Sequence, residues 1–403
     1  MMAATPTAGL GGRAIDRPLA VLTLIMAASV TESLVNVLPS FVGALTDVLG
    51  LSALRTGLLA SADLTGIALA TASAVWWLRE VSWRRTVFAS LSVLLVLNLA
   101  CLGVTHFWWL LALRLLAGLA TGTAFAVALA GVLDTRNADR NTGLMVCMQV
   151  IVGAAGVYAL DAVPAAWRLN AVYLYIIAWL VPTLALSWLH FPNDPGDRPS
   201  EGALQWRKLA GRGTALILGT VLYWLMIGAV WGYLEGVARD AGLSLVQTGE
   251  ALSIGLIVSL IGSFASAWIG VRLGRALPLI ITAIFQIGCL YLLTRLSHYE
   301  SPVMAFYVIN TVFQIFWSYV IAYFIIVFND VDPSGRFVAF YGTACHSALA
   351  VGPYVGALLI VKGRYTPLMW FGIVALLVCY GCFLGAVWLN RIRLQTPMIA
   401  SRA

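Results

Sequence analysis

The chain has 403 residues, of which 61% are hydrophobic and only 10% are charged, and its mean hydropathy is +0.92. Soluble domains contain about 45–50% apolar and about 25% charged residues, so this composition excludes a soluble protein. The formal net charge of +7 comes from basic residues that are scattered over the polar connections, which argues against a nucleic-acid partner.

Twelve long apolar stretches, separated by short polar connections, follow one another along the chain. Each is long enough, as an α-helix, to cross about 30 Å of hydrocarbon, so we predict an all-α protein of the lipid bilayer. The first stretch is longer than the apolar run of a signal peptide, which indicates a retained helix. The predicted spans are 18–45, 55–78, 86–104, 108–133, 142–163, 169–190, 214–238, 247–271, 277–297, 302–328, 338–361 and 367–390.

Lysine and arginine are concentrated in alternate connections, beginning with Arg13 and Arg17 before the first span. The positive-inside rule therefore places both termini in the cytoplasm, which requires an even number of crossings. The longest polar connection divides the spans into six and six. We expect a cytoplasmic tail at 1–17, an N-terminal six-helix bundle at 18–190, a cytoplasmic linker at 191–213, a C-terminal six-helix bundle at 214–390 and a cytoplasmic tail at 391–403.

Motifs recur across the linker, which indicates two homologous halves. The sequence 83–85 after the second span, Trp-Arg-Arg, is echoed by 272–275, Arg-Leu-Gly-Arg, after the eighth. The glycine-containing segment 152–156 of the fifth span is echoed by 351–356 of the eleventh. Secondary transporters use such repeats to expose a central site to each side of the membrane in turn.

These motifs resemble those of the major facilitator superfamily, and the resemblance covers nearly the whole chain. The family's loop signature is roughly G-x-x-x-D-R-x-G-R-R. After the eighth span it is kept as Arg272, Gly274 and Arg275, with Val271 in the place of the acid. The resemblance implies that these residues take part in gating.

The first copy of the loop signature is reduced to Arg84 and Arg85. In relatives, the Asp and Arg of this loop lock the cytoplasmic side of the outward-facing state. Either Glu80 supplies the acid to Arg84 or Arg85 in this chain, or the lock is loose.

Two further family signatures lie inside spans. The helix-four signature R-x-x-x-G-x-x-x-G is present as Arg114, Gly118 and Gly122, and we expect the two glycines to be close-packing surfaces. A family-like Gly-Pro-x-x-Gly motif, with an expected role in gating or packing, stands in the eleventh span at Gly352, Pro353 and Gly356.

The resemblance implies twelve helices in two pseudo-symmetric bundles, and a monomeric secondary transporter of the bacterial inner membrane. Glu32 and Pro39 in the first span are similar to the acid and late proline of drug- and sugar-exporting members.

The six cysteines all lie in apolar stretches, so no disulfide framework is indicated. We find no metal-ligand spacing, no phosphate-binding loop and no nucleophile with a base, so we expect neither an enzyme nor a cofactor.

Glu32 is a candidate proton carrier. Ser29, Glu32, Asn36 and Ser40 share one stripe of an otherwise apolar helix, which predicts that this stripe faces a water-filled cavity. A carboxylate at mid-membrane is unfavourable, so a low-dielectric surrounding favours its protonated form. The alternative is a carboxylate permanently paired with Arg114 or hydrogen-bonded to the fourth span.

Three other ionisable side chains are candidates for proton coupling. Asp63 and Arg114 enter the membrane at similar depth, so we predict an Asp63–Arg114 pair or a triad that includes Glu32. The family resemblance links the helix-four arginine to proton coupling; the alternative is a static buried salt bridge. His346 is the histidine that lies well inside a span, and it is either a coupling residue or a hydrogen-bonded packing residue.

The seventh and tenth spans are expected to supply most of the solute site. Aromatic side chains with a few amides suit an amphipathic solute. Asn310, Gln314 and Trp317 share one helical face, whereas Trp231 and Tyr233 belong either to the cavity or to the interfacial belt. The predicted solute-binding residues are Asn36, Tyr223, Trp224, Asn310, Phe313, Gln314 and Trp317.

Glu235 lies near the outer end of its span, and we expect it in the solvated rim.

The leading hypothesis for function is proton-coupled export of a small amphipathic organic molecule. The alternative is proton-coupled uptake of an aromatic or short-chain organic acid, with Arg114 binding its carboxylate.

Overall fold

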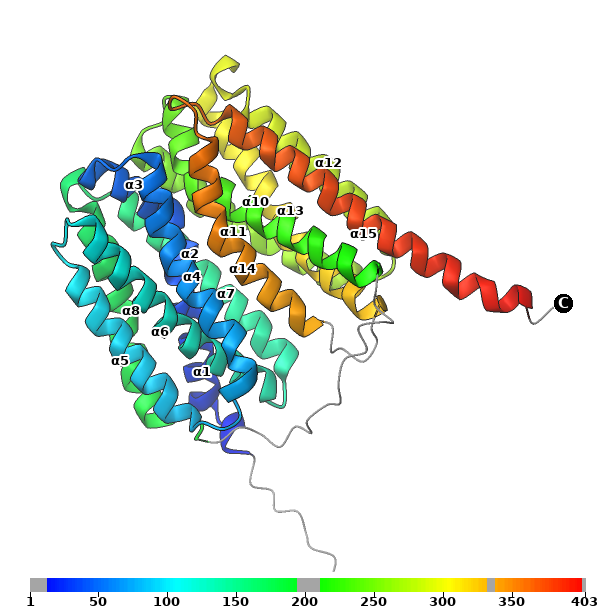
Figure 1. Ribbon diagram of the computed structural model, residues 1–403, viewed down its shortest axis with the longest axis horizontal. Coiled ribbons are helices and arrows are strands. Elements are labelled where there is room, and N and C mark those ends of the chain that lie inside the picture. The colour runs from blue at the N-terminus through cyan, green and yellow to red at the C-terminus, as the bar shows by residue number, and fades with distance from the viewer. Residues whose placement is uncertain (1–12, 194–210, 332–337, 401–403) are drawn as a thin grey trace, which may run out of the picture.

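The computed structural model describes residues 13–193, 211–331 and 338–400 (Figure 1). Most of the predicted N-terminal tail and of the linker 191–213 lies outside these residues, as do residues 401–403 of the predicted C-terminal tail. The helices are η1 (Ala14–Asp16), α1 (Pro18–Thr31), α2 (Ser33–Asn36), α3 (Leu38–Leu49), α4 (Ala53–Trp77), α5 (Trp83–Cys101), α6 (Phe107–Asp134), α7 (Ala138–Asp161), η2 (Ala165–Trp167), α8 (Arg168–His190), α10 (Arg212–Asp240), α11 (Leu245–Ile269), α12 (Ala276–Leu293), η3 (Leu296–His298), α13 (Pro302–Val331), α14 (Val338–Leu359) and α15 (Thr366–Ala400).

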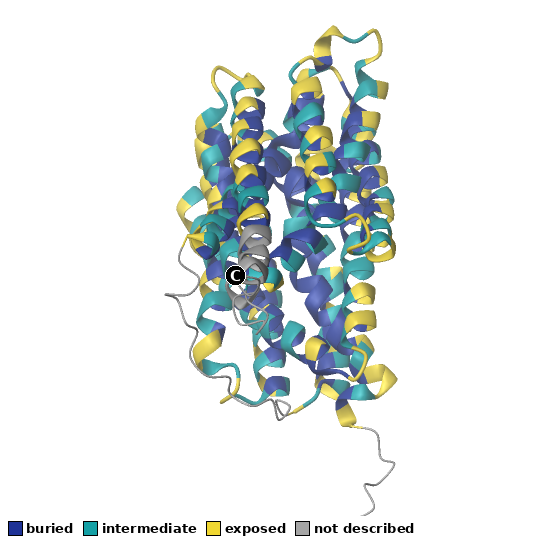
Figure 2. Cartoon of the chain, turned by 90° about the vertical axis from the view of Figure 1, so that its right-hand side faces the viewer, coloured by how far each residue is buried: buried dark blue, intermediate teal, exposed yellow. Residues whose placement is uncertain are grey.

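Each predicted span coincides with helix in the structure. By length and composition, ten helices of the described residues qualify as membrane-spanning. The helices α1 to α3 together occupy the first predicted span, and α14 occupies the eleventh. Large apolar side chains such as Val75, Trp76, Phe264 and Trp268 are exposed. Figure 2 shows exposed residues along the outside of the helices, as expected for surfaces that contact lipid.

The first span is not one continuous helix, which corrects the prediction for 18–45. It breaks at Glu32, between α1 and α2, and at Val37, between α2 and α3. Pro39 explains the second break, because proline has no N–H to donate to the carbonyl of Val35. The indole Nε1 of Trp231 donates to that carbonyl instead, at 3.1 Å, so the freed group is satisfied from α10.

The helices form two halves, α1 to α8 and α10 to α15, which lie side by side in Figure 1. The main contacts between the halves join α4 with α14 and α7 with α11. In both pairs the second span of one half packs on the fifth span of the other, so the two interfaces are related by the repeat. This arrangement is the two pseudo-symmetric six-helix bundles expected from the sequence.

Glycines permit the closest helix contacts, as predicted for the fourth span. A Cβ on Gly118 would lie 1.9 Å from the carbonyl oxygen of Asp63, and one on Gly122 would lie 2.6 Å from that of Ile67. In the eleventh span, a Cβ on Gly352 would lie 2.6 Å from the Cα of Gly228. Because any side chain there would force the backbones apart, these glycines fix α6 against α4 and α14 against α10.

Candidate functional site

A cavity of about 410 Å³ lies between the two halves. Its wall is formed by the broken first span, α6 and α7 from the N-terminal half, and by α10, α11, α13 and α14 from the C-terminal half. Five phenylalanine, tyrosine or tryptophan side chains give it a largely apolar surface: Phe125, Trp224, Trp231, Trp317 and Tyr341. Among the described residues that line the cavity, the ionisable groups of carboxyl or imidazole type are Glu32 and His346, and none is lysine or arginine.

Glu32 and His346 meet across the boundary between the halves. The Oε1 of Glu32 lies 3.7 Å from the Nε2 of His346, and the ring of Phe125 contacts that of His346 edge-on at 5.6 Å between centroids. The imidazole Nδ1 is 3.1 Å from the carbonyl oxygen of Gly342. Because a carbonyl can only accept, Nδ1 carries a hydrogen, and Nε2 is the nitrogen that faces the carboxyl group.

At this separation the two groups are within ion-pair range but are not hydrogen-bonded, and Oε1 of Glu32 has no hydrogen-bond partner among the described residues. If Nε2 is protonated, an imidazolium ion faces a carboxylate; if it is not, its lone pair faces a carboxylic acid. Loss of the shared proton leaves a carboxylate opposite a lone pair, which is a repulsive arrangement. The attraction between these two side chains therefore depends on whether the imidazole is protonated.

The predicted Asp63–Arg114 pair is present, at 3.7 Å between Oδ1 and Nη1. Arg114 also donates to Oδ1 of Asn98 at 3.3 Å and lies 5.2 Å from the centre of the Tyr173 ring. Both members of the pair are buried inside the N-terminal half and neither lines the cavity. Within the described residues, Glu32 has no ion pair with Arg114, so the predicted triad is not formed.

The predicted solute residues divide into two groups. Asn36, Trp224, Gln314 and Trp317 line the cavity. Tyr223, Asn310 and Phe313 lie behind its wall and are fully or almost fully buried.

The buried group is held by contacts inside the C-terminal half. The Tyr223 hydroxyl accepts from Nε2 of Gln286 at 3.0 Å, and Nδ2 of Asn310 donates to the carbonyl of Ala251 at 2.8 Å. The stripe predicted on the first span is also divided by the helix breaks. Ser29 donates to the carbonyl of Met145 at 3.2 Å, and Ser40 is fully buried.

The predicted gating arginines contact neighbouring helix ends. Arg84 donates to the carbonyl oxygens of Phe191 and Leu189, at 2.8 and 3.2 Å, so the contacts observed for it are with the end of α8 rather than with Glu80. Arg275 forms a two-point ion pair with Asp330 at the end of α13, at 2.8 and 3.0 Å.

Other members of the gating and packing set have simpler surroundings. Arg272 donates to the carbonyl of Trp268 at 3.1 Å. Gly274 has a φ of 71°, which favours glycine in this turn. Arg85 lies in the first turn of α5. Pro353 is inside α14, where its carbonyl accepts from the Tyr233 hydroxyl at 3.0 Å, and a Cβ on Gly356 would lie 2.8 Å from the Tyr233 ring.

Sequence reasoning missed a charged cluster built around Arg168. This cluster, called the Arg168 cluster below, consists of Asp47, Asp161, Arg168, Glu235 and Arg239. Arg168 is fully buried, and its guanidinium lies 2.7 Å from Asp161, 2.8 Å from Glu235 and 2.9 Å from Asp47. Arg239 adds an ion pair with Asp47 at 2.9 Å.

The Arg168 cluster ties α3, α7 and α8 of one half to α10 of the other. Glu235 is 1% exposed, so the prediction of a solvated rim position is wrong. The sequence did carry a signal, since three acids and two arginines stand at the ends of spans that the topology places on one side. It was missed because each of these residues was considered alone.

Contacts between the halves are concentrated on one side of the cavity. Besides the Arg168 cluster, the Tyr233 hydroxyl lies 3.4 Å from the carbonyl oxygen of Ala53, and the backbone N–H of Tyr354 donates to the Ser61 hydroxyl at 3.1 Å. These contacts lie toward the end of the bundle that carries the α3–α4 connection, called the α3–α4 end below. Toward the opposite end, where α1 begins, the two halves diverge (Figure 1).

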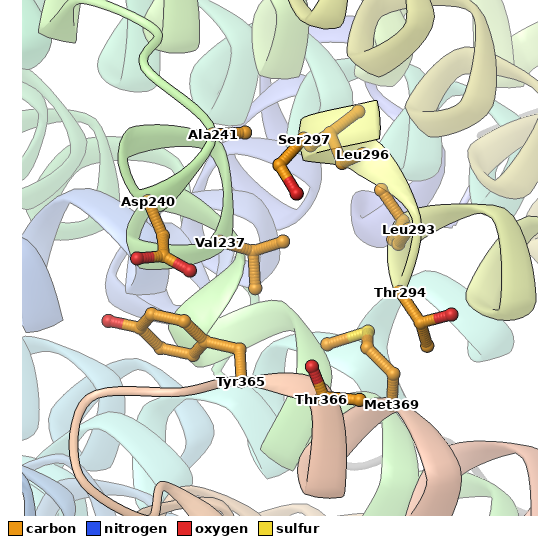
Figure 3. Close-up of a pocket in the computed structure, with 10 residues that line it drawn as sticks. All are labelled: Val237, Asp240, Ala241, Leu293, Thr294, Leu296, Ser297, Tyr365, Thr366 and Met369. Carbon is orange, nitrogen blue, oxygen red and sulfur yellow. The ribbon is translucent and has the colours of Figure 1, made fainter. Parts of the chain in front are cut away.

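A second, smaller pocket of about 80 Å³ lies wholly within the C-terminal half, between the end of α10, the α12–η3 segment and the start of α15 (Figure 3). Asp240 and Tyr365 lie next to each other in its wall. Because this pocket does not touch the N-terminal half, the relative motion of the halves would not open or close it. Across the described ranges, no group of three or more His, Cys, Asp or Glu side chains is placed to hold a metal ion.

Comparison with known proteins agrees with this architecture. The model of the Major Facilitator Superfamily matches residues 19–353. The fold is similar to the crystal structure of a mutant of the nucleoside transporter NupG, with 12% identity, a TM-score of 0.68, and coverage of 93% of this chain and 99% of that one. It is similar to a D-xylose-proton symporter, with 13% identity, a TM-score of 0.70, and coverage of 90% and 96%.

A third similar structure is a bacterial homolog of the human lysosomal transporter Spinster, described as inward-facing and unoccupied. It shares 13% identity at a TM-score of 0.68, with coverage of 93% of this chain and 98% of that one. At these identities the likeness concerns the fold alone. Comparison with curated protein sequences gives no match.

Proposed function

Because this chain belongs to the Major Facilitator Superfamily, whose members are transporters and not enzymes, we propose that it exports a small amphipathic organic solute in exchange for protons. The observation that carries this proposal is the Glu32–His346 pair. Its two members come from different halves, face each other at 3.7 Å, and both line the central cavity.

The position of this pair supports proton coupling. With one shared proton, Glu32 and His346 attract each other and hold the halves together at mid-cavity. Without that proton, the attraction is lost, and the carboxylate of Glu32 is left without a counter-charge, which is unfavourable inside the membrane. A solute that contacts Glu32 therefore competes with the proton, and such competition is the linkage that an exchanger requires.

The cavity wall supports an amphipathic and non-anionic solute. Three tryptophans and a phenylalanine provide apolar and aromatic surface, and Asn36, Gln149 and Gln314 provide polar groups. Arg114, which the alternative hypothesis needs to bind a carboxylate, is held by Asp63 and Asn98 outside the cavity lining. Among the described residues of its wall, the cavity thus offers no guanidinium to an organic acid.

We expect the Glu32→Gln variant to lose gradient-driven transport but to keep solute exchange, because glutamine preserves the size of the side chain and cannot release a proton. The measurement is accumulation of radiolabelled aromatic amides and amines in reconstituted vesicles with an imposed pH difference, corrected for protein-free vesicles. A Glu250→Gln variant is the matched control, since Glu250 accepts from the Tyr307 hydroxyl at 2.9 Å and is not part of the cavity wall. Wild-type rates that do not respond to the pH difference would contradict the proposal.

The alternative to export is uptake, in which the proton and the solute move in the same direction. Cells that lack the protein separate the two. They accumulate the solute if the protein is an exporter, and they fail to take it up if the protein is an importer.

A further inference from the structure

An unpartnered amide stands in the wall of the central cavity. Gln314 of α13 is 1% exposed, and neither its Oε1 nor its Nε2 has a hydrogen-bond partner within the described part of the chain. Buried polar groups without a partner are unfavourable and are rare in folded proteins. Because Gln314 lines the cavity, a solute bound there can supply a partner to both atoms.

Among the three tryptophans of the cavity wall, the one with an unpaired N–H group is next to Gln314 on α13. Nε1 of Trp231 donates to the carbonyl of Val35 at 3.1 Å, and Nε1 of Trp224 donates to the Tyr341 hydroxyl at 3.4 Å. Nε1 of Trp317 is buried and, among the described residues, has no acceptor. Trp317 is one helical turn from Gln314, so the free donor and the free amide lie on the same face of α13.

The nearest intramolecular alternative leaves most of these groups unsatisfied. Asn310, one turn before Gln314, has a buried Oδ1 without a partner. A rotation of the Gln314 side chain toward Asn310 can pair the Nε2 of one with the Oδ1 of the other. The structure does not contain this pairing: in the observed geometry both Gln314 atoms and the Trp317 N–H have no partner among the described residues.

These groups define a complementary ligand. The Trp317 N–H and the Gln314 NH₂ are donors that require an acceptor, and the Gln314 carbonyl is an acceptor that requires a donor. A carboxamide or a lactam presents a carbonyl and an N–H side by side. A ketone leaves the Gln314 carbonyl unpaired, an amidinium leaves the two donors unpaired, and a carboxylate meets no cation in a cavity that already contains Glu32.

We propose that Gln314 and Trp317 form the recognition point for an uncharged carboxamide or lactam carried by an aromatic solute. This inference rests on the proposed function in that it takes the central cavity to be the solute site. The aromatic body packs against the tryptophans, since the Trp317 ring already meets Trp224 and Trp231 edge-on, at 6.4 and 6.0 Å between centroids.

The test is equilibrium binding of four probes that share one ring system and differ in the polar group: 2-naphthamide, 2-acetonaphthone, 2-naphthoate and 2-naphthamidine. Binding to the purified full chain in detergent is measured by isothermal titration calorimetry. We expect the amide to bind about tenfold more tightly than each of the others, which corresponds to about one net hydrogen bond. Equal or tighter binding of the ketone or the carboxylate, or no binding of the amide, would overturn the proposal.

Two substitutions locate the preference. Gln314→Met keeps the length of the side chain without its amide, and Trp317→Phe keeps an aromatic ring without its N–H; each is expected to bring the amide down to the affinity of the ketone. Trp268→Phe is the matched control, because Trp268 is exposed on α11 and does not line the cavity, and it is expected to retain the preference. Unchanged unfolding temperatures confirm that the variants are folded.

The same measurement separates this inference from proton coupling. The Glu32→Gln variant is expected to keep the ratio of amide to ketone affinity, because it leaves Gln314 and Trp317 intact. Failure of pH-driven transport therefore leaves the binding result standing. An amide preference that survives both Gln314→Met and Trp317→Phe assigns recognition to other residues and overturns the inference.

Discussion

At the scale of single residues, the central feature is the contact between Glu32 and His346, two ionisable groups that lie 3.7 Å apart in the wall of the cavity. Each was singled out because an ionisable group deep in an apolar span requires a partner or a proton. Their contact joins residues from opposite halves of the chain. A single sequence predicts how deep each residue lies in the membrane, but it does not predict how one helix is rotated relative to another. For the same reason Tyr223 was predicted in the cavity beside Trp224, although the two neighbours point in different directions.

The pair predicts non-additive behaviour. We expect His346→Gln to abolish pH-driven transport about as fully as Glu32→Gln, and the double variant to be no worse than either single variant, because one shared proton is lost in each case. His298→Gln, an exposed position in η3, is the control. Vesicle transport under an imposed pH difference checks this, and losses that multiply in the double variant would argue for two independent proton sites.

At the scale of elements, length and hydropathy were sufficient to predict every span, because a segment in lipid has few alternatives to a helix. The break in the first span was not predicted. Pro39 was visible in the sequence, but whether proline ends, bends or interrupts a helix depends on which group satisfies the freed carbonyl. Here the answer is Trp231, 196 residues away.

The packing of α6 on α4 predicts a contrast between two glycines. Gly118→Ala is expected to destabilise the fold by about 1–3 kcal/mol, because the added methyl group would overlap the carbonyl of Asp63. Gly143→Ala in α7 is the control, since nothing lies within 4 Å of its Cβ position, and it is expected to be neutral or slightly stabilising. Thermal unfolding of the two variants in detergent measures the difference. An unfolding temperature that is equally unchanged in both would show that α6 can shift without penalty.

At the scale of the whole molecule, the two halves are held together at the α3–α4 end. The sequence predicted the halves and their repeat, because loop motifs and span number are local features. It did not predict which end is joined, since this depends on charges from four helices that meet only in three dimensions.

The Arg168 cluster leads to a prediction about the distance between the two halves at the α3–α4 end. We expect Arg168→Met to weaken the joined end, because it leaves Asp161 and Glu235 buried without their cation. Spin labels on Leu54→Cys and Val246→Cys in a cysteine-free background report the distance between the halves at this end, since both positions are exposed. The distance is expected to lengthen in Arg168→Met and to stay unchanged in Arg55→Met, whose side chain lies over Phe107 of the same half. An unaltered distance in Arg168→Met would assign the closure to the helix packing alone.

The burial of the Arg168 cluster has a consequence for the medium around the protein. When the halves separate at this end, charged groups that had neutralised one another become exposed to water and to dissolved ions. Mobile ions screen exposed charges strongly and buried pairs only weakly, so they stabilise the separated state more than the joined one. Higher ionic strength on the side of the membrane that this end faces therefore shifts the conformational equilibrium toward the separated state. Salt then regulates the protein from one side of the membrane without being transported.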